Sequence, residues 1–216
     1  MCFSATASFG ASIALTAIGI ASYKQVKEPS QYPFASIPLI FGVQQFMEGI
    51  VWVSATHDAW AGFQAPASYG FIGIAQIIWP LLFPIAFSLV EKDMGRKRFI
   101  KLLQIPGIII AAYFLYVLAF FNLDTRIINH HVFYDIDFPR KLIPYAAGFY
   151  LAATVVPPLL SKNSLIKLIG IILLAGYLVA RIFFQPSLIS LWCFFGIASS
   201  IVVYMVLRNA KLKTTV

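Results

Sequence analysis

The chain has 216 residues, of which 60% are hydrophobic and only 11% are charged, and its mean hydropathy is +0.84. Soluble domains usually carry about a quarter charged residues. This composition therefore excludes an ordinary soluble globule of 24.0 kDa. The net charge of +8 is no sign of nucleic-acid binding, because the lysines and arginines lie at the ends of apolar runs rather than among aromatic residues.

Apolar runs long enough to cross a bilayer, which takes ~20 residues of helix, follow one another along the chain. They predict a single all-α integral membrane domain over residues 1–216, a seven-transmembrane helix bundle. The expected spans are residues 3–23, 33–55, 69–90, 99–121, 142–160, 165–184 and 187–207. A polar stretch, Asn122–Lys141, separates the fourth span from the fifth and is expected to be a loop.

Lysine and arginine fall unequally on the two sides of these spans. With the N-terminus outside, twelve lie in cytoplasmic segments and four (Arg126, Arg140, Lys141 and Arg181) on the outer side. Because cytoplasmic loops carry an excess of Lys and Arg, we expect a multi-pass protein of the cell membrane with a cytoplasmic C-terminus.

Small residues and prolines recur within the spans. Ser4, Ser8, Ser12 and Thr16 repeat every four residues and predict a face on which another helix packs closely. Prolines such as Pro80 are expected to produce ordinary helix kinks.

Glu48 is the clearest ionisable residue inside a span, and such a residue is by default a candidate functional site. Gln44, Glu48 and Trp52 are spaced at i, i+4 and i+8 and share one helix face, with Gln45 beside them. Glu48 lies ~10 Å from the outer end of its span. Gln76 is about as deep in the next span, which should pack antiparallel to the second.

These residues predict a polar pocket that opens outward. Gln44, Gln45 and Gln76 would donate and accept hydrogen bonds, and Trp52 and Trp79 would form its walls. Arg181, the cation within a span, is the expected partner of Glu48. Burial in hydrocarbon favours the protonated form of Glu48 unless Arg181 neutralises its charge.

Three functions fit this pattern. The first is binding or transport of a small molecule or ion. The second is a membrane-embedded enzyme acting on a lipid-like substrate at the outer leaflet, with Cys2, Glu48 or His57 as candidate catalytic residues. The third is a structural or assembly subunit in which Glu48 only fixes helix packing. The bilayer is the expected partner in each case, and the sequence identifies no cofactor.

Histidines gather on the outer side, with acidic residues near them. His57, His130, His131 and Asp135 are weak candidates for a zinc site. His130 and His131 are adjacent and point in different directions on a regular element, and no His-x-x-x-His or His-Glu-x-x-His motif occurs. We therefore predict no metal site.

The chain opens with Met1-Cys2-Phe3-Ser4-Ala5-Thr6-Ala7-Ser8-Phe9 and carries Gln44-Gln45-Phe46-Met47-Glu48-Gly49-Ile50-Val51-Trp52 in its second span. In these two blocks it resembles a mainly bacterial family of multi-pass membrane proteins that open with MCFSA-x-ASF and carry QQ-x-x-EG-x-x-W. That family has no assigned activity. The resemblance implies a bacterial inner-membrane location and directs attention to Cys2, Gln44, Gln45, Glu48 and Trp52.

Overall fold

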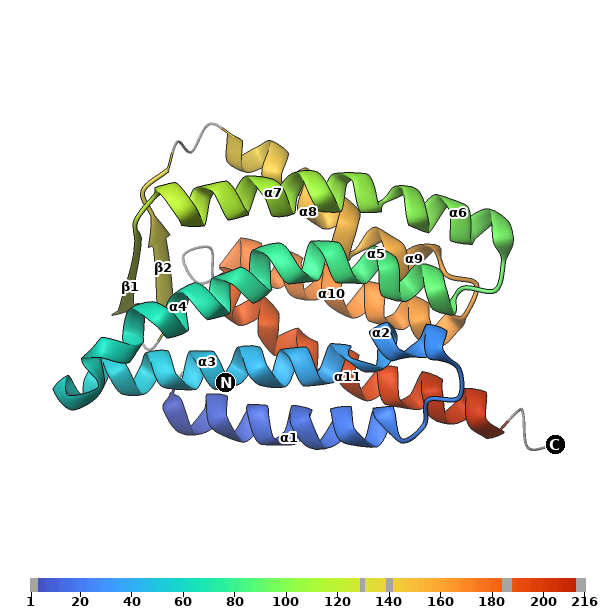
Figure 1. The fold of residues 1–216 in the computed structure, drawn as a ribbon, viewed down its shortest axis with the longest axis horizontal. Coiled ribbons are helices and arrows are strands. Elements are labelled where there is room, and N and C mark those ends of the chain that lie inside the picture. The colour runs from blue at the N-terminus through green and yellow to red at the C-terminus, as the bar shows by residue number, and fades with distance from the viewer. Residues whose placement is uncertain (1–3, 129–130, 139–141, 184–187, 213–216) are drawn as a thin grey trace.

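Long helices lie side by side along the longest axis of the molecule (Figure 1). The computed structural model describes residues 4–128, 131–138, 142–183 and 188–212. The elements in chain order are α1 (Ala5–Tyr23), η1 (Pro29–Gln31), α2 (Tyr32–Ala35), α3 (Ile37–Thr56), η2 (Asp58–Phe63), α4 (Gln64–Gly73), the π-helical η3 (Ile74–Ile78), α5 (Trp79–Val90), α6 (Met94–Leu102), α7 (Gln104–Phe120), β1 (Leu123–Ile128), β2 (His131–Ile136), α8 (Ile143–Thr154), α9 (Val156–Leu160), α10 (Ser164–Phe183) and α11 (Leu188–Leu212).

Each of the seven expected apolar runs is helical over most of its length. Within the described part of the chain, five helical stretches are long and apolar enough to cross a membrane: residues 5–23, 29–56, 58–90, 94–120 and 164–183. The run at 142–160 is shorter in the structure, because it is divided at Val155 into α8 and α9. The helical bundle is thus shown, and the count of seven spans stays a prediction.

A β-hairpin occupies much of the stretch expected to be a loop. Strands β1 and β2 pair antiparallel, with Leu123 opposite Ile136 and Ile128 opposite His131. Along β1, half-buried and exposed residues alternate, which is the two-residue period of a strand with one covered face. The structure therefore departs from the all-α prediction here.

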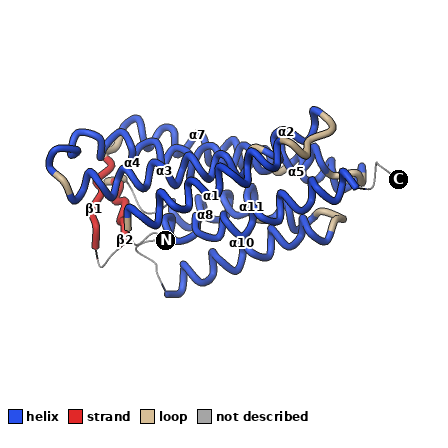
Figure 2. The backbone as a smooth tube through the Cα atoms, turned by 90° about the horizontal axis from the view of Figure 1, so that it is seen from below, coloured by secondary structure: helices blue, strands red, loops and turns tan. Residues whose placement is uncertain are grey.

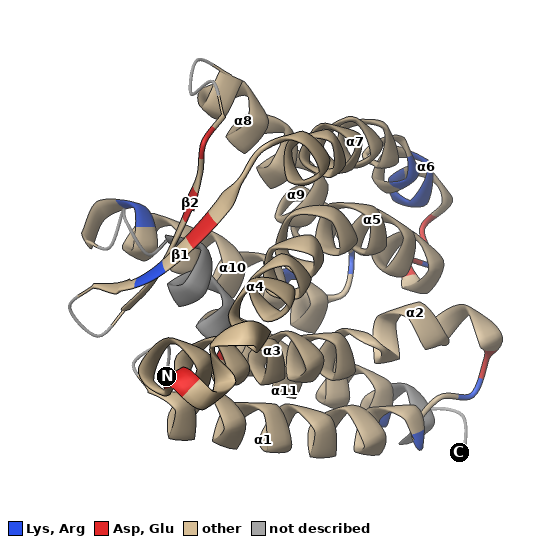
Figure 3. Cartoon of the chain, turned by 60° about the vertical axis from the view of Figure 1, so that its left-hand side comes forward, with Lys and Arg blue, Asp and Glu red and all other residues tan. Residues whose placement is uncertain are grey.

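The two ends of the bundle differ in what they carry. We call the end with β1 and β2 the hairpin end (Figure 2). The turns between α5 and α6 and between α9 and α10 lie at the opposite end, with the end of α11 (Figure 1). This is the basic end, and Figure 3 shows its concentration of Lys and Arg on α6.

Close helix contacts are made through small residues, as the serine repeat predicts. The hydroxyl of Ser12 on α1 donates a 2.8 Å hydrogen bond to the carbonyl of Gly42 on α3. A Cβ at Gly42 would lie 2.8 Å from Oγ1 of Thr16, and one at Gly49 would lie 2.6 Å from the Phe9 ring. The packing face on α1 is confirmed at Ser8 and Ser12, which are buried.

Candidate functional site

Three polar side chains are buried on one face of α3. Gln44 and Glu48 are 0% exposed and Gln45 is 1% exposed. Glu48 lies two turns before the end of α3 at Thr56, which places it ~12 Å along the helix from that end. These three side chains therefore point into the interior of the bundle and are not exposed at its surface.

A hydrogen bond links two of these groups along the helix. Nε2 of Gln45 donates to Oε2 of Glu48 over 3.2 Å. Buried polar groups are costly unless they are hydrogen-bonded, and the i, i+3 spacing lets one side chain of α3 satisfy another. Gln45 therefore holds the carboxyl group of Glu48 in place.

Gln44 joins this face to another helix. Nε1 of Trp79, the first residue of α5, donates a 2.8 Å hydrogen bond to Oε1 of Gln44. The Trp79 ring packs on Phe41, one turn before Gln44, with 4.0 Å between ring centroids. A Cβ at Gly196 of α11 would lie 2.6 Å from that same Phe41 ring. Helices α3, α5 and α11 thus converge here.

Trp79 follows directly from the π-helical turn η3. The backbone N–H of Trp79 bonds to the carbonyl of Ile74, five residues earlier. The carbonyl of Ala75 then has no helical donor, because Trp79 is already used and Pro80 has no N–H. The hydroxyl of Tyr150 on α8 donates to it over 2.5 Å. A hydrogen bond from a third helix therefore supplies the donor that the Ala75 carbonyl lacks within its own helix.

Trp52 lies one turn beyond Glu48, toward the hairpin end. It is 6% exposed and packs in a cluster with Val51, Ala67 and Val132 of the hairpin. Its Nε1 has no hydrogen-bond partner in the described structure. We call Gln44, Gln45 and Glu48 the Glu48 cluster. The hairpin therefore covers the end of the α3 face next to this cluster.

Two other expected members of the pocket are not joined to it. Gln76 is half-buried in η3, and its side chain makes no hydrogen bond with a described residue. Arg181, on the last turn of α10, is exposed, and no ion pair joins it to Glu48. The Gln45 amide is a partner of Glu48, whereas charge complementarity predicts the Arg181 guanidinium.

Of the residues considered for catalysis or metal binding, the structure describes Glu48, His57, His131 and Asp135. Cys2 and His130 lie outside the described residues. His57 is exposed and its Nδ1 lies 2.9 Å from Oγ1 of Thr56, ~13 Å along α3 from Glu48 by helical rise. His131 and Asp135 lie on β2, where Asp135 is opposite Asp124. No group of three or more His, Cys, Asp or Glu residues in the described ranges could hold a metal ion.

A second buried carboxylate, which was not among the predicted site residues, lies at the basic end. Glu91 is 5% exposed. Its Oε1 accepts from the backbone N–H groups of Lys92 and Asp93, at 2.9 and 3.0 Å. Its Oε2 accepts from Oγ of Ser161 at 2.7 Å and from the N–H of Lys162 at 2.9 Å. Glu91 therefore ties the α5–α6 turn to the α9–α10 turn.

The ionisation of Glu91 reflects these contacts. Burial raises the pKa of its carboxyl, and the hydrogen bonds from Asp93, Ser161, Lys162 and Lys92 together outweigh burial and hold the pKa below its ordinary value of 4.5. The sequence position of Glu91 could have indicated this role. A glutamate directly after an apolar run and before a basic helix is well placed to accept hydrogen bonds from backbone N–H groups at a helix junction.

The chain matches a known protein family over almost its whole length. The model of a family of unknown function (DUF6629) matches residues 1–215. No curated protein and no solved structure matches the chain. Since the family match covers nearly its whole length, the chain belongs to this family of unknown function, DUF6629.

Proposed function

We propose that the chain is a seven-span protein of the cell membrane, in bacteria the inner membrane, with the hairpin end outside and the basic end in the cytoplasm. Five long apolar helical stretches support a membrane location. Large apolar side chains such as Ile13, Phe120 and Ile182 are exposed on these helices, as lipid-facing residues are. The gathering of Lys and Arg at one end supports the orientation.

Within this bundle, we propose that the Glu48 cluster binds a small molecule or ion and supports its transport. The observation that carries the proposal is the complete burial of Glu48 within an apolar helix, beside two buried amides. A carboxylate in such surroundings is costly, and membrane proteins that keep one generally use it. A packing role alone needs no titratable group.

The cluster has the chemistry to exchange a proton or a small cation. Glu48 would bind the charged species, and Gln44 and Gln45 would complete its coordination with amide oxygens or N–H groups. Trp79 forms one wall, and Trp52 lies between Glu48 and the hairpin. Because Val132 packs in the Trp52 cluster, we infer that a ligand from the outer side enters when the hairpin moves.

Infrared difference spectroscopy of the reconstituted protein tests the carboxyl directly. The probes are protons and Na⁺, supplied as steps of pH and of NaCl concentration. We expect a carboxylic C=O band that responds to either probe and is absent in Glu48→Gln. The control is Glu28→Gln, because Glu28 is exposed before η1 and outside the helices, so that variant should keep the band.

A flux measurement extends the test to transport. Proteoliposomes containing a pH-sensitive dye should show proton movement under an imposed gradient with the wild type and the Glu28→Gln control, and much less with Glu48→Gln. A Glu48→Gln protein that folds, by size exclusion and thermal unfolding, and keeps both the band and the flux would refute the proposal. Should that variant not fold, Glu48→Asp, which keeps a carboxyl, must shift the band, and an unchanged band would equally refute it.

A structural role is the second candidate, and the Gln44–Trp79 hydrogen bond favours it. This bond joins α3 to α5, so the cluster can serve to fix how the two helices pack. In that case Glu48→Gln and Trp79→Phe lower the stability to a similar degree, and neither probe produces a carboxyl band in the wild type.

A further inference from the structure

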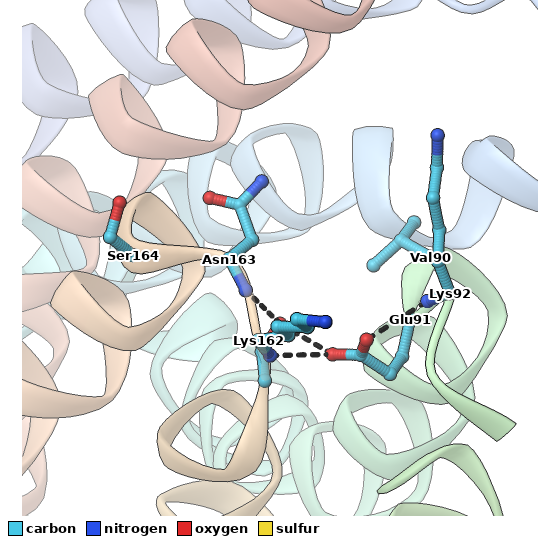
Figure 4. Close-up of a pocket in the computed structure, with 7 residues that line it drawn as sticks. Val90, Glu91, Lys92, Lys162, Asn163 and Ser164 are labelled. Carbon is cyan, nitrogen blue, oxygen red and sulfur yellow. Dashed lines mark hydrogen bonds between the residues drawn. The ribbon is translucent and has the colours of Figure 1, made fainter. Parts of the chain in front are cut away.

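A cavity of about 420 Å³ lies at the basic end, away from the Glu48 cluster. It is formed by two turns that are distant in sequence, residues 90–92 after α5 and residues 161–164 before α10. Figure 4 shows Lys162 and Asn163 on one side and Val90 and Lys92 on the other. The Glu91 hydrogen bonds hold the two turns together, so the shape of the cavity is fixed by buried contacts.

The lining favours an anion. Lys92 and Lys162 are exposed, and neither ammonium group makes an ion pair or a hydrogen bond with a described residue. Glu91 is the acidic residue of the lining, and each of its oxygens already accepts two hydrogen bonds from the protein. Its charge is therefore compensated by four fixed donors. Asp93, beside the lining, attracts Arg96 and Lys162 electrostatically, but no ion pair with a described residue holds either lysine ammonium, so both can reach a ligand.

The adjacent helix α6 places the cavity at the level expected for lipid headgroups. It continues into α7 as one helical stretch, Met94–Phe120, that is long and apolar enough to cross a membrane. Its apolar Met94, Phe99 and Leu102 are exposed beside Arg96, Lys97, Arg98 and Lys101. Exposed apolar residues interleaved with basic ones are typical of helices at a membrane interface.

Contacts tie this interfacial helix to the cavity. Nη1 of Arg96 donates a 2.8 Å hydrogen bond to the carbonyl of Leu160, the residue before the 161–164 turn. Ile105, Ile108 and Ile109 on the following helix are exposed, and acyl chains can lie against them. The surroundings therefore suit an amphiphile with an anionic head better than a free anion.

We propose that this cavity binds the phosphate headgroup of an anionic phospholipid, with Lys92 and Lys162 as its cationic ligands. The proposal rests on the membrane location argued above and is independent of any role of Glu48. Basic pockets between membrane helices on the cytoplasmic side are suited to anionic headgroups.

Native mass spectrometry of the purified protein with defined lipids tests the proposal. The probes are phosphatidylglycerol, phosphatidylcholine and inorganic phosphate. We expect phosphatidylglycerol to remain bound in preference to phosphatidylcholine. The double variant Lys92→Gln/Lys162→Gln should weaken this binding roughly 25-fold, since each lysine near an anionic surface contributes ~5-fold.

The matched control is Lys24→Gln/Arg208→Gln, which removes two exposed charges that do not line the cavity. This control should bind phosphatidylglycerol within about twofold of the wild type, because Lys24 and Arg208 lie outside the cavity and cannot contact a headgroup bound in it. An equal loss in both double variants would mean general attraction to a basic surface and would overturn the site. Binding of inorganic phosphate with no preference between the two lipids would overturn the lipid as its occupant.

Both double variants change exposed residues, and thermal unfolding checks that each is folded. The Glu48 carboxyl band is a separate measurement, so failure here leaves that test intact.

Discussion

The indole N–H of Trp79 donates a 2.8 Å hydrogen bond to the side-chain carbonyl of Gln44, and both side chains are buried. The bond connects the first turn of α5 to the middle of α3. It lies one helical turn from Glu48, so the position of the carboxyl group depends on how these two helices meet.

Trp79→Phe should therefore lower the free energy of unfolding by about 1–3 kcal/mol, because it removes the donor and leaves a buried carbonyl that has lost a hydrogen bond. The measurement is unfolding in mixed detergent micelles. Trp60→Phe is the control, because Trp60 is 53% exposed on η2, and it should change stability by no more than ~0.5 kcal/mol. Equal effects of the two substitutions would show that the bond contributes nothing specific.

Tyr150→Phe tests the turn that positions Trp79. The hydroxyl of Tyr150 satisfies the carbonyl of Ala75, which has no helical donor because Pro80 follows the π-helical turn. Its removal should destabilise the protein by about 1–3 kcal/mol. Tyr145→Phe on the same helix is the matched control, since Tyr145 is exposed. If the turn positions Trp79, Tyr150→Phe and Trp79→Phe should be less than additive in the double variant.

Helical periodicity made part of this site predictable. Gln44, Glu48 and Trp52 are four residues apart, and a helix must place them on one face. All three lie on α3 and are buried. The serine repeat on α1 likewise predicts close packing, which the Ser12–Gly42 bond confirms. These features depend on local spacing alone.

The parts that the sequence did not predict depend on partners distant in the chain. Pro80 predicts a kink, but nothing near it indicates that Tyr150 supplies the missing donor. Opposite charges predict that Arg181 pairs with Glu48, yet its helix leaves Arg181 exposed. The polar composition of Asn122–Lys141 predicts a loop, although Leu123, Thr125 and Ile127 alternate with exposed residues as in a strand.

The carboxyl group of Glu91 predicts how the stability of the protein changes at low pH. Its folded-state pKa lies below 4.5, so its contribution to stability is fully present above pH 4.5 and is lost as the pH falls through the folded-state value. Glu91→Gln should cost about 1–3 kcal/mol at neutral pH, because an amide N–H₂ cannot accept from Ser161 or Lys162. It should also reduce the loss of stability below pH 4.5.

Thermal unfolding between pH 7 and pH 3 measures both effects. Glu28→Gln, an exposed glutamate at the same end, should leave the neutral-pH stability within ~0.5 kcal/mol of the wild type. An acid dependence that is unchanged in Glu91→Gln would show that other groups are responsible for it.

The docking of the hairpin can be tested by proteolysis at Arg126 in β1. The hairpin is held by Gln64, whose Nε2 donates to the carbonyl of Thr125 over 2.9 Å, and by the burial of Val132. Val132→Asp places a carboxylate without a partner in that apolar contact. It should therefore release the hairpin and speed trypsin cleavage after Arg126, as measured by the mass of the fragments.

Ile128→Asp is the control, because Ile128 lies on the same hairpin and is exposed. Its cleavage rate should stay near that of the wild type, and equal acceleration by both substitutions would mean that Val132 does not hold the hairpin.

The side of the membrane from which trypsin cleaves also tests the proposed orientation. Fragments formed by external trypsin in right-side-out vesicles place the hairpin outside, whereas fragments formed only in inverted vesicles would reverse the proposed orientation. Because the hairpin covers the Trp52 end of the α3 face, Val132→Asp should also quicken the response of the Glu48 carboxyl band to Na⁺ if ligands reach the cluster from that side.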